Sequence, residues 1–281
     1  MTNKTTKAYW GRIHKKTDKC GALEKKMIQI GTFVFGENIK YFKSYSRYLF
    51  NNICNKYLPK NKKLKMIEIG CAPGKYLIEL NQHFGYIPFG VEYSKEGIEL
   101  TKKNFSMAGI DCKNIIYGDF FNHNFQKKYR NYFDIVFSFG FIEHFDKPHD
   151  IIAHHINLLK KNGFLVIAIP NLLYFNYLLM LILNPKLIKM HNLKIMNYKN
   201  FKNLFSNLSL QCLYCNYYGT INLGLINTER DKKIKRSFSK LLILFQYIAL
   251  NPFSHFLFKN KGCESKFFSP FLIYIGKKVN D

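Results

Sequence analysis

The amino-acid sequence predicts an α/β protein built around a doubly wound, mostly parallel sheet of seven strands. From Lys65 onwards, short apolar segments alternate with longer amphipathic ones, which is typical of βαβ units with both sheet faces covered. Glycine turns and acidic residues follow several apolar segments, at the sheet edge where open α/β domains bind ligands. Two further strand-like segments near the C-terminus, 209–220 and 270–278, complete the predicted sheet.

Five apolar segments are the expected parallel strands. They cover residues 66–70, 87–92, 114–118, 133–139 and 164–169. The stretches between them predict helices at about 75–83, 95–107 and 149–161, and a further helix is expected around 200–207. The helix at 149–161 follows Pro148, and Asn162-Gly163 is expected to stop it and turn the chain into the fifth strand.

Length and composition favour one large domain with additions. The 281 residues are 47% hydrophobic and 22% charged, which excludes a disordered tail, a collagen-like fibre and a disulfide-stabilised miniprotein. The seven cysteines are odd in number and far apart, so a reducing compartment is favoured over a disulfide framework. The first twenty residues contain no apolar run, so we expect no secretory signal. The sequence therefore predicts a cytoplasmic protein.

The pattern of apolar and polar residues along the chain suggests two units. Residues 1–60 are expected to form an N-terminal helical cap and residues 61–281 the α/β domain, with a cap segment at about 171–200 and an insertion at about 221–268. Two apolar runs, Leu172 to Leu183 and Leu241 to Leu250, are shorter than the roughly 20 residues of a spanning helix. We expect the second to end at Asn251-Pro252, and we expect both to be buried, to cover a pocket or to touch a membrane surface.

The formal net charge of +25 raises the question of nucleic-acid binding. Only five of the basic residues are arginine, the side chain that phosphate and base readers prefer, and the lysines are spread along the chain. We therefore expect no specific nucleic-acid partner, although the charge favours anionic small molecules or acidic lipids.

The sharpest motif is Glu68-Ile69-Gly70-Cys71-Ala72-Pro73-Gly74, which follows the first strand and opens a helix. Gly70 and Gly74 allow a tight turn and let a ligand approach the main chain. The same motif alone is also compatible with a purely structural strand-to-helix turn.

Further candidates end the next three strands. Glu92 ends the second strand, where a carboxylate binds ribose hydroxyls, and Asp119 ends the third, where an acid accepts from an exocyclic amine. Phe120 is placed to cover a base, and Phe139 ends the fourth strand. The ordered set points to a nucleoside-containing ligand.

Together these motifs resemble class I S-adenosylmethionine-dependent methyltransferases, in particular the group that includes ubiquinone-biosynthesis and small-molecule or sugar O-methyltransferases. The similarity is specific from about Lys65 to Asn171 and looser as far as Lys278. It implies that the methionine part of S-adenosylmethionine is held by Glu68, Gly70, Cys71, Ala72 and Gly74. It also implies that Glu92 binds the ribose, that Tyr93 lies beside the adenine, and that Asp119 binds the adenine amine.

The resemblance further implies an antiparallel last strand, and Phe120 and Phe139 are assigned to the cofactor site with the acids. The turn departs from the usual pattern, because Ala72 stands at its middle glycine and Pro73 follows. No metal is expected, since Cys212 and Cys215 have no second pair at metal-ligand spacing.

A hydroxyl or ammonium acceptor must lose a proton, and the candidate bases are His144 with the adjacent Glu143, and His191. Each also has a simpler interpretation: His144 packs near the cofactor and orients its loop, and His191 is an ordinary pocket or surface residue. The alternative for Glu143 is contact with the methionine end of the cofactor. A similar Glu-His-Phe in mycolic-acid cyclopropane synthases supplies a bicarbonate ligand. Trp10 is expected to be a buried anchor, with an N-terminal lid as the alternative.

The sequence thus predicts methyl transfer to an oxygen, with nitrogen as second choice, of a small polar or anionic acceptor such as a sugar or a cell-surface glycan precursor. Three alternatives stay open: a lipid-acting enzyme at the membrane surface, an RNA methyltransferase, and a non-catalytic cofactor-binding subunit.

Overall fold

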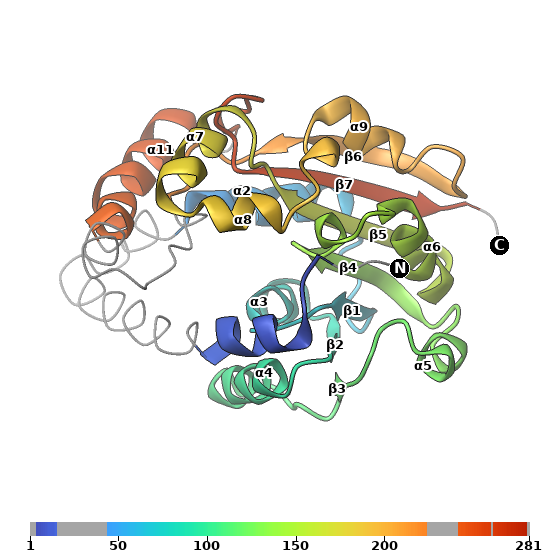
Figure 1. Cartoon of the computed structure of the whole chain (residues 1–281). Helices are drawn as coiled ribbons and strands as arrows, with labels where there is room; N and C mark the ends of the chain where they lie inside the picture. The colour runs from blue at the N-terminus through green and yellow to red at the C-terminus, as the bar shows by residue number, and fades with distance from the viewer. Residues whose placement is uncertain (1–3, 16–43, 224–240, 260, 280–281) are drawn as a thin grey trace.

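The computed structural model describes residues 4–15, 44–223, 241–259 and 261–279. A single seven-stranded sheet runs through them in the order β3-β2-β1-β4-β5-β7-β6 (Figure 1). The strands are β1 Lys65–Ile69, β2 Ile87–Glu92, β3 Ile115–Tyr117, β4 Phe133–Phe139, β5 Leu159–Pro170, β6 Leu210–Tyr218 and β7 Phe271–Lys278. Neighbouring strands from β3 to β5 are parallel, and β7 is antiparallel to both β5 and β6. The predicted fold class is confirmed.

Helices cover both faces of the sheet, because alternate residues of each strand point to opposite sides. On one face, Met66, Ile135 and Val166 form an apolar core with α2, α3 and α4. On the other, Ile67, Val136 and Leu165 join a core with α5, α6, α7 and α9. The helices are α2 Tyr45–Tyr57, α3 Lys75–Phe84, α4 Lys95–Met107, α5 His123–Lys128, α6 Pro148–Leu158, α7 Tyr174–Leu183, α8 Pro185–Lys189, α9 Tyr198–Asn203 and α11 Asn251–Phe258.

One half-buried carboxylate joins the amino ends of three strands. Asp134 of β4 accepts a hydrogen bond from the Lys65 N–H of β1 at 2.8 Å and another from the Lys160 ammonium of β5 at 2.8 Å. This contact aligns the three central strands, so their carboxyl ends reach the same edge of the sheet, where the functional site lies.

The boundary between α6 and β5 differs from the prediction. The helix ends at Leu158, not at Lys161, and Leu159 already pairs with Phe133 in the sheet. Asn162, with φ of +62°, and Gly163 therefore lie inside a register irregularity of β5 and do not stop the helix. Burial of Leu158 and Leu159 decided this boundary against the local turn signal.

The predicted N-terminal cap is described in part. Residues 7–15 and α2 are helical, and residues 16–43 lie outside the described part. The predicted cap segment at 171–200 contains α7 and α8, whereas residues 224–240 of the predicted insertion lie outside the described part.

The second apolar run continues beyond the predicted end at Asn251-Pro252. Pro252 is accommodated inside a continuous helix because a π-helical turn, Gln246–Leu250, leads directly into α11 and widens the backbone just before the proline. Leu241–Phe258 is therefore one helix of 18 residues with a mean hydropathy of 1.5 and 17% of its residues buried. By length and composition alone it is a candidate membrane span, so the expected ten-residue helix was wrong.

Candidate functional site

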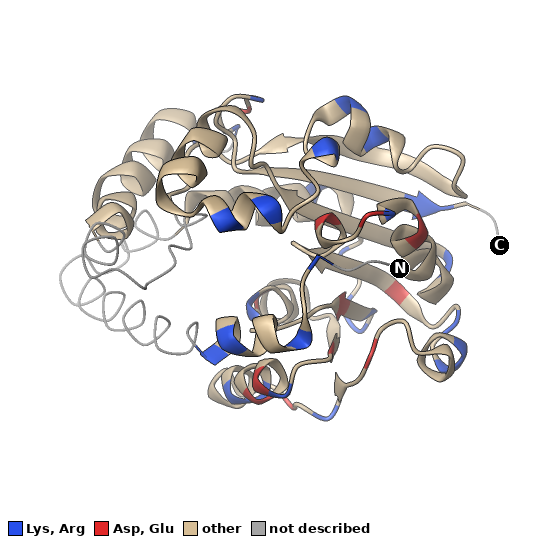
Figure 2. Ribbon diagram, viewed as in Figure 1, with Lys and Arg blue, Asp and Glu red and all other residues tan. Residues whose placement is uncertain are grey.

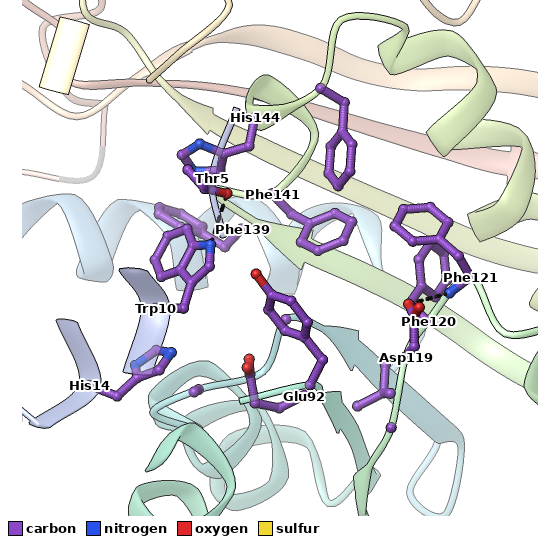
Figure 3. Close-up of a pocket in the computed structure, with 17 residues that line it drawn as sticks. Thr5, Trp10, His14, Glu92, Asp119, Phe120, Phe121, Phe139, Phe141 and His144 are labelled. Atoms are coloured by element: carbon purple, nitrogen blue, oxygen red, sulfur yellow. Dashed lines mark hydrogen bonds between the residues drawn. The ribbon is translucent and has the colours of Figure 1, made fainter. Parts of the chain in front are cut away.

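A cavity of about 220 Å³ lies at the carboxyl ends of β1, β2 and β4 (Figure 3). Its walls come from the strand ends and from the N-terminal segment of the chain. Of the residues predicted to bind the cofactor, Gly70, Ala72, Glu92, Tyr93, Asp119, Phe120 and Phe139 line it. His144, a predicted base, lines it as well.

Gly70 is required by the shape of this cavity. Its φ is +69°, a conformation that favours glycine, and a Cβ there would lie 2.9 Å from Cδ2 of Phe141. The Gly70 N–H donates to the Val91 carbonyl at 3.0 Å, which ties the turn to the neighbouring strand. Any side chain here would therefore displace the Phe141 ring from the cavity wall.

Two buried carboxylates lie beneath the turn. Glu68 and Glu92 are 4% and 5% exposed, on neighbouring strands. Burial raises the pKa of both, and the charge of Glu92 adds to the effect on Glu68. One Glu68 oxygen has no hydrogen-bond partner among the described residues, whereas the Glu92 Oε1 accepts from the Ser94 N–H at 2.8 Å. Glu92 lines the cavity, whereas Glu68 lies behind the wall. A ligand with hydroxyl donors would satisfy the Glu92 carboxylate, which is the chemistry that the ribose of S-adenosylmethionine offers.

The opposite side of the cavity is suited to bind the adenine ring of a nucleoside. The Asp119 Oδ1 accepts from the Phe121 N–H at 2.9 Å, which fixes this exposed carboxylate at the rim beside the Phe120 ring (Figure 3). The Tyr93 hydroxyl is buried without a partner among the described residues. The predicted roles of Glu92 toward the ribose and of Tyr93 and Asp119 toward the adenine fit this arrangement.

Two predicted cofactor residues of the turn do not present their side chains to the cavity. Cys71 is buried, its N–H donates to the Val91 carbonyl at 3.2 Å, and its Sγ faces Gly90 of β2. Gly74 caps α3 with φ of +80°, and a Cβ there would meet Thr101 and Phe105. Neither residue lines the cavity, so any contribution that they make to cofactor binding comes through the backbone of the turn.

The N-terminal segment supplies a wall that was not among the predicted site residues. Thr5, Trp10 and His14 line the cavity, and the Trp10 Nε1 donates to the Thr5 hydroxyl at 3.0 Å. The Lys4 N–H donates to the His144 carbonyl at 2.9 Å, which fastens the segment to the end of β4. Trp10 thus forms part of the cavity wall, which fits the alternative prediction of an N-terminal lid. The spacing of Trp10 and His14 by one helical turn was the available sequence signal.

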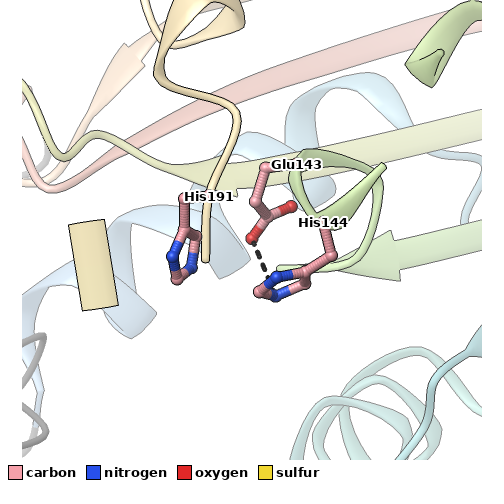
Figure 4. Close-up of side chains that lie close together, drawn as sticks. All are labelled: Glu143, His144 and His191. Carbon is pink, nitrogen blue, oxygen red and sulfur yellow. Dashed lines mark ion pairs between the residues drawn. The ribbon is translucent and has the colours of Figure 1, made fainter. Parts of the chain in front are cut away.

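Glu143, His144 and His191 lie together beside the cavity (Figure 4). The first two belong to a 3-10 turn, Ile142–His144, and are 1% and 4% exposed. The rings of His144 and His191 have centroids 4.5 Å apart, and the His144 Nε2 lies 3.9 Å from a Glu143 oxygen. Glu143 and His191 are not on the cavity wall, so only His144 of the three predicted catalytic residues reaches the ligand space.

The protonation of this cluster follows from burial. Desolvation lowers the pKa of His144 to about 3 and that of His191 to about 4, and it raises the pKa of Glu143 to about 8. The Nδ1 of His144 is 3.0 Å from the Met190 carbonyl, and the Nδ1 of His191 is 2.7 Å from the Leu187 carbonyl. A carbonyl only accepts, so both neutral rings carry their proton on Nδ1 and leave Nε2 as an acceptor. Among the described residues, these three are the group whose metal-ligating atoms lie within 4.8 Å of one another.

The family comparison places this site in a known class. A family described as "Methyltransferase domain" matches residues 41–214. The chain is also 28% identical over 141 residues to the ubiquinone biosynthesis O-methyltransferase of Glaesserella parasuis, a match that covers 49% of this chain and 58% of that protein. The matched region thus spans little more than half of that relative.

Solved structures share the fold. A SAM-dependent methyltransferase from Archaeoglobus fulgidus matches with a TM-score of 0.52 and 19% identity, covering 88% of this chain and 99% of the other. A geranyl diphosphate C-methyltransferase from Streptomyces coelicolor A3(2), solved with S-adenosyl-L-homocysteine, matches with a TM-score of 0.52 and 11% identity over 83% and 78% of the two chains. S-adenosylmethionine is the cofactor of this family. The Streptomyces coelicolor structure also contains Mg²⁺ and geranyl diphosphate. The chain belongs to the methyltransferase-domain family and is a class I S-adenosylmethionine-dependent methyltransferase.

Proposed function

We propose that this enzyme methylates a hydroxyl oxygen of a small acceptor and that His144 removes the proton of that hydroxyl. The observation that carries the proposal is the position of His144: its ring lines the cavity, and the Met190 carbonyl holds its Nδ1. The relative from Glaesserella parasuis, an O-methyltransferase by name, supports oxygen as the acceptor atom. Nitrogen is the second choice.

The bound S-adenosylmethionine supplies an electrophilic methyl group on a sulfonium. The protein's own contribution is to hold the acceptor oxygen in line with that methyl and to exclude water. Trp10, Phe139 and Phe141 provide an aromatic wall for this purpose. The edge of the Trp10 ring contacts His144 with centroids 5.2 Å apart, so the wall also fixes the imidazole.

Proton removal uses a pair of residues. The unprotonated Nε2 of His144 accepts the acceptor's proton, and the resulting imidazolium is stabilised by the Glu143 carboxylate 3.9 Å away. Because the pKa of Glu143 is raised to about 8, the carboxylate form becomes dominant only above that pH. Turnover should therefore rise as the pH increases through about 8.

The acceptor class is proposed from the walls of the cavity. The sugar and glycan precursors suggested by the charged surface need many polar partners, whereas aromatic rings dominate the wall around His144. This lining favours an acceptor with a planar ring or an apolar body that carries one reactive hydroxyl. The RNA alternative rests on net charge alone.

The test is transfer of labelled methyl from S-adenosylmethionine to a panel of phenols and catechols, sugars and sugar phosphates, lipids, and RNA. We expect label in the phenolic acceptors, and turnover of His144→Ala should be lower by roughly a hundredfold or more with unchanged cofactor affinity. His149→Ala, an exposed histidine of α6, is the control. Full turnover by His144→Ala would remove His144 from the mechanism, and label confined to sugars, lipid or RNA would overturn the acceptor class.

We also propose a cytoplasmic location. The six described cysteines form no disulfide, which supports a reducing compartment. Fractionation of cells that express the protein, with thiol labelling of each fraction, checks this proposal. Oxidised thiols in an extracytoplasmic fraction would contradict it.

A further inference from the structure

Helix α7 is apolar on two opposite sides. It buries Asn176, Met180 and Leu183 against the domain. The other side is exposed, and the large apolar side chains on it are Tyr174, Phe175, Leu178, Leu181 and Ile182. The solvent side of a surface helix is normally polar, so this side is built for a different environment.

The helix Leu241–Phe258 has the same character. Its large exposed side chains recur at intervals of three and four residues, with Phe256 81% exposed. They are Leu241, Leu244, Phe245, Ile248, Phe253, Phe256 and Leu257. Neither helix contains a charged residue.

The two helices share one surface. The Phe175 N–H donates to the Phe267 carbonyl at 3.1 Å, and the rings of Tyr174 and Phe267 have centroids 5.1 Å apart. Phe267 belongs to the segment between α11 and β7. Half-buried residues of both helices, Leu179 of α7 and Leu242 and Leu250 of the second helix, pack against the same apolar core. Thirteen of the seventeen large apolar side chains that are exposed in the described ranges belong to these two helices and Phe267. We call this surface the apolar face.

Positive charge borders the apolar face. Figure 2 shows α7 and α11 without charged residues and two basic residues on α8, which follows α7 directly. The bordering lysines are Lys186, Lys189, Lys259, Lys261 and Lys266. No Asp or Glu occurs between Asp150 and Glu229, and the nearby Glu264 carboxylate accepts hydrogen bonds from Tyr214 and Asn216 of β6.

We propose that the apolar face docks on the surface of an anionic lipid bilayer. Its apolar side chains would enter the boundary between headgroups and acyl chains, and the bordering lysines would contact lipid phosphates. This inference does not depend on which acceptor is methylated.

The longer helix lies flat on the bilayer in this arrangement and does not cross it. Its inner side is fixed to the domain by the buried polar residues Gln246, Asn251 and Ser254. The Gln246 Oε1 accepts from the Leu223 N–H at 2.9 Å, and the Asn251 Oδ1 accepts from the Tyr45 N–H of α2 at 3.5 Å. A helix held along its length by such contacts cannot leave the domain without losing them.

Charge argues for lipid over a second copy of the chain. Two copies that meet through the apolar face would bring two lysine borders together, and each copy carries a net charge of +25. An anionic bilayer complements the same border, and each lysine near it adds to the attraction.

The test is flotation of the full chain with vesicles of phosphatidylcholine, with and without about one third phosphatidylglycerol. We expect binding to the anionic vesicles, much weaker binding to the neutral ones, and release by high salt. Two double variants remove apolar area from the face, Leu178→Gln with Ile182→Gln and Phe253→Gln with Phe256→Gln. Each should weaken binding at least about tenfold.

The matched control is Met107→Gln with Val279→Gln, which changes exposed apolar residues elsewhere and should bind like the wild type. Unchanged cofactor affinity shows that each variant is folded. The proposal is overturned by absence of binding to anionic vesicles, or by equal binding of the face variants and the wild type. Protein that high salt and alkaline carbonate do not extract would also overturn it, since the helix would then cross the bilayer. A dimer that the face variants abolish, without vesicle binding, would assign the face to a second copy.

Discussion

The two ends of the cavity are built in different ways. The cofactor end consists of residues that end or directly follow β1, β2 and β3, so each is positioned by its own strand. The acceptor end brings together the N-terminal segment and the turn after β4, joined by the hydrogen bond from the Lys4 N–H to the His144 carbonyl. The segment after α8 supports that turn from outside the cavity, through the Asn192 N–H bond to the Glu143 carbonyl. The cofactor end is therefore local in the sequence, whereas the acceptor end exists only in the folded chain.

The two ends also differ in their electrostatics. At the cofactor end, the buried Glu92 carboxylate lines the cavity, where a ligand supplies hydrogen-bond donors. At the acceptor end, Glu143 is buried with no hydrogen-bond partner for either carboxylate oxygen among the described residues, beside two neutral histidines. The cofactor supplies hydrogen-bond donors to the Glu92 carboxylate of the first end. At the second end, ionisation of the buried Glu143 carboxyl would lower the stability of the folded protein.

The largest effect is expected at the acceptor end, for Glu143→Gln. The pKa of Glu143 is raised from 4.5 to about 8, so between these pH values the unfolded chain has lost a proton that the folded chain keeps. Wild-type stability should therefore fall as the pH rises through this window, by about 5 kcal/mol in total. The variant should lack that loss, melt higher than the wild type at pH above 8 and converge with it near pH 4.

Thermal melts across this pH range measure the effect, with Glu99→Gln on the exposed side of α4 as the control. If Glu143→Gln and the wild type showed parallel pH profiles, the buried carboxyl would not be a source of instability.

The cofactor end is tested by Glu92→Ala. Loss of hydrogen bonds from a buried carboxylate to the ribose should weaken S-adenosylmethionine binding about a hundredfold, or about 3 kcal/mol. The melting temperature should not fall, because the variant also removes a desolvated charge. Calorimetric titration measures the affinity, and Glu99→Ala should bind like the wild type. Unchanged affinity in Glu92→Ala would refute the ribose assignment.

A smaller effect is expected where the two ends meet, at Gly70. A Cβ would lie 2.9 Å from Phe141 in a backbone conformation with φ of +69°. Gly70→Ala should cost about 2 kcal/mol, shared between stability and cofactor binding. Gly109→Ala separates the two causes, since Gly109 has a φ of +70° but a Cβ added there would meet nothing within 4 Å. Equal losses in both variants would show that the Phe141 contact is unimportant.

The smallest effect is expected for Trp10. Trp10→Ala removes the ring contacts with His144 and His14 and should weaken acceptor binding by about 1 kcal/mol, or roughly fivefold. Trp10→Phe keeps an aromatic wall and should recover most of that loss. The Michaelis constant for the acceptor measures the change, and a value unaltered in Trp10→Ala would show that the N-terminal helix does not contact the acceptor.

The order of segments along the sequence was sufficient to predict the sheet and which residues lie at the cofactor end of the cavity. Strand-forming segments alternate with helical ones, and Gly70, Glu92 and Asp119 lie at the ends of consecutive strands, so the parallel arrangement alone brings them to one edge. Spacing alone does not tell on which side of a turn a side chain lies, and the Cys71 side chain lies against Gly90, away from the cavity.

Other features depended on burial and long-range contacts. The end of α6 at Leu158 follows from the burial of Leu158 and Leu159, although the local signal at Asn162-Gly163 pointed further along the chain. The continuation of the second apolar helix through Pro252 likewise depends on packing of Asn251 and Ser254 against the domain.

By itself, the sequence determined the fold class, the family and the cofactor end, because these depend on local periodicity and on residues at the ends of strands. Only the tertiary structure decided that Trp10 and His144 share a wall, that the Glu143 carboxylate oxygens have no hydrogen-bond partner among the described residues, and that two apolar helices form one exposed face. The physical reason is that burial and desolvation are properties of a residue's three-dimensional surroundings, to which distant parts of the chain contribute.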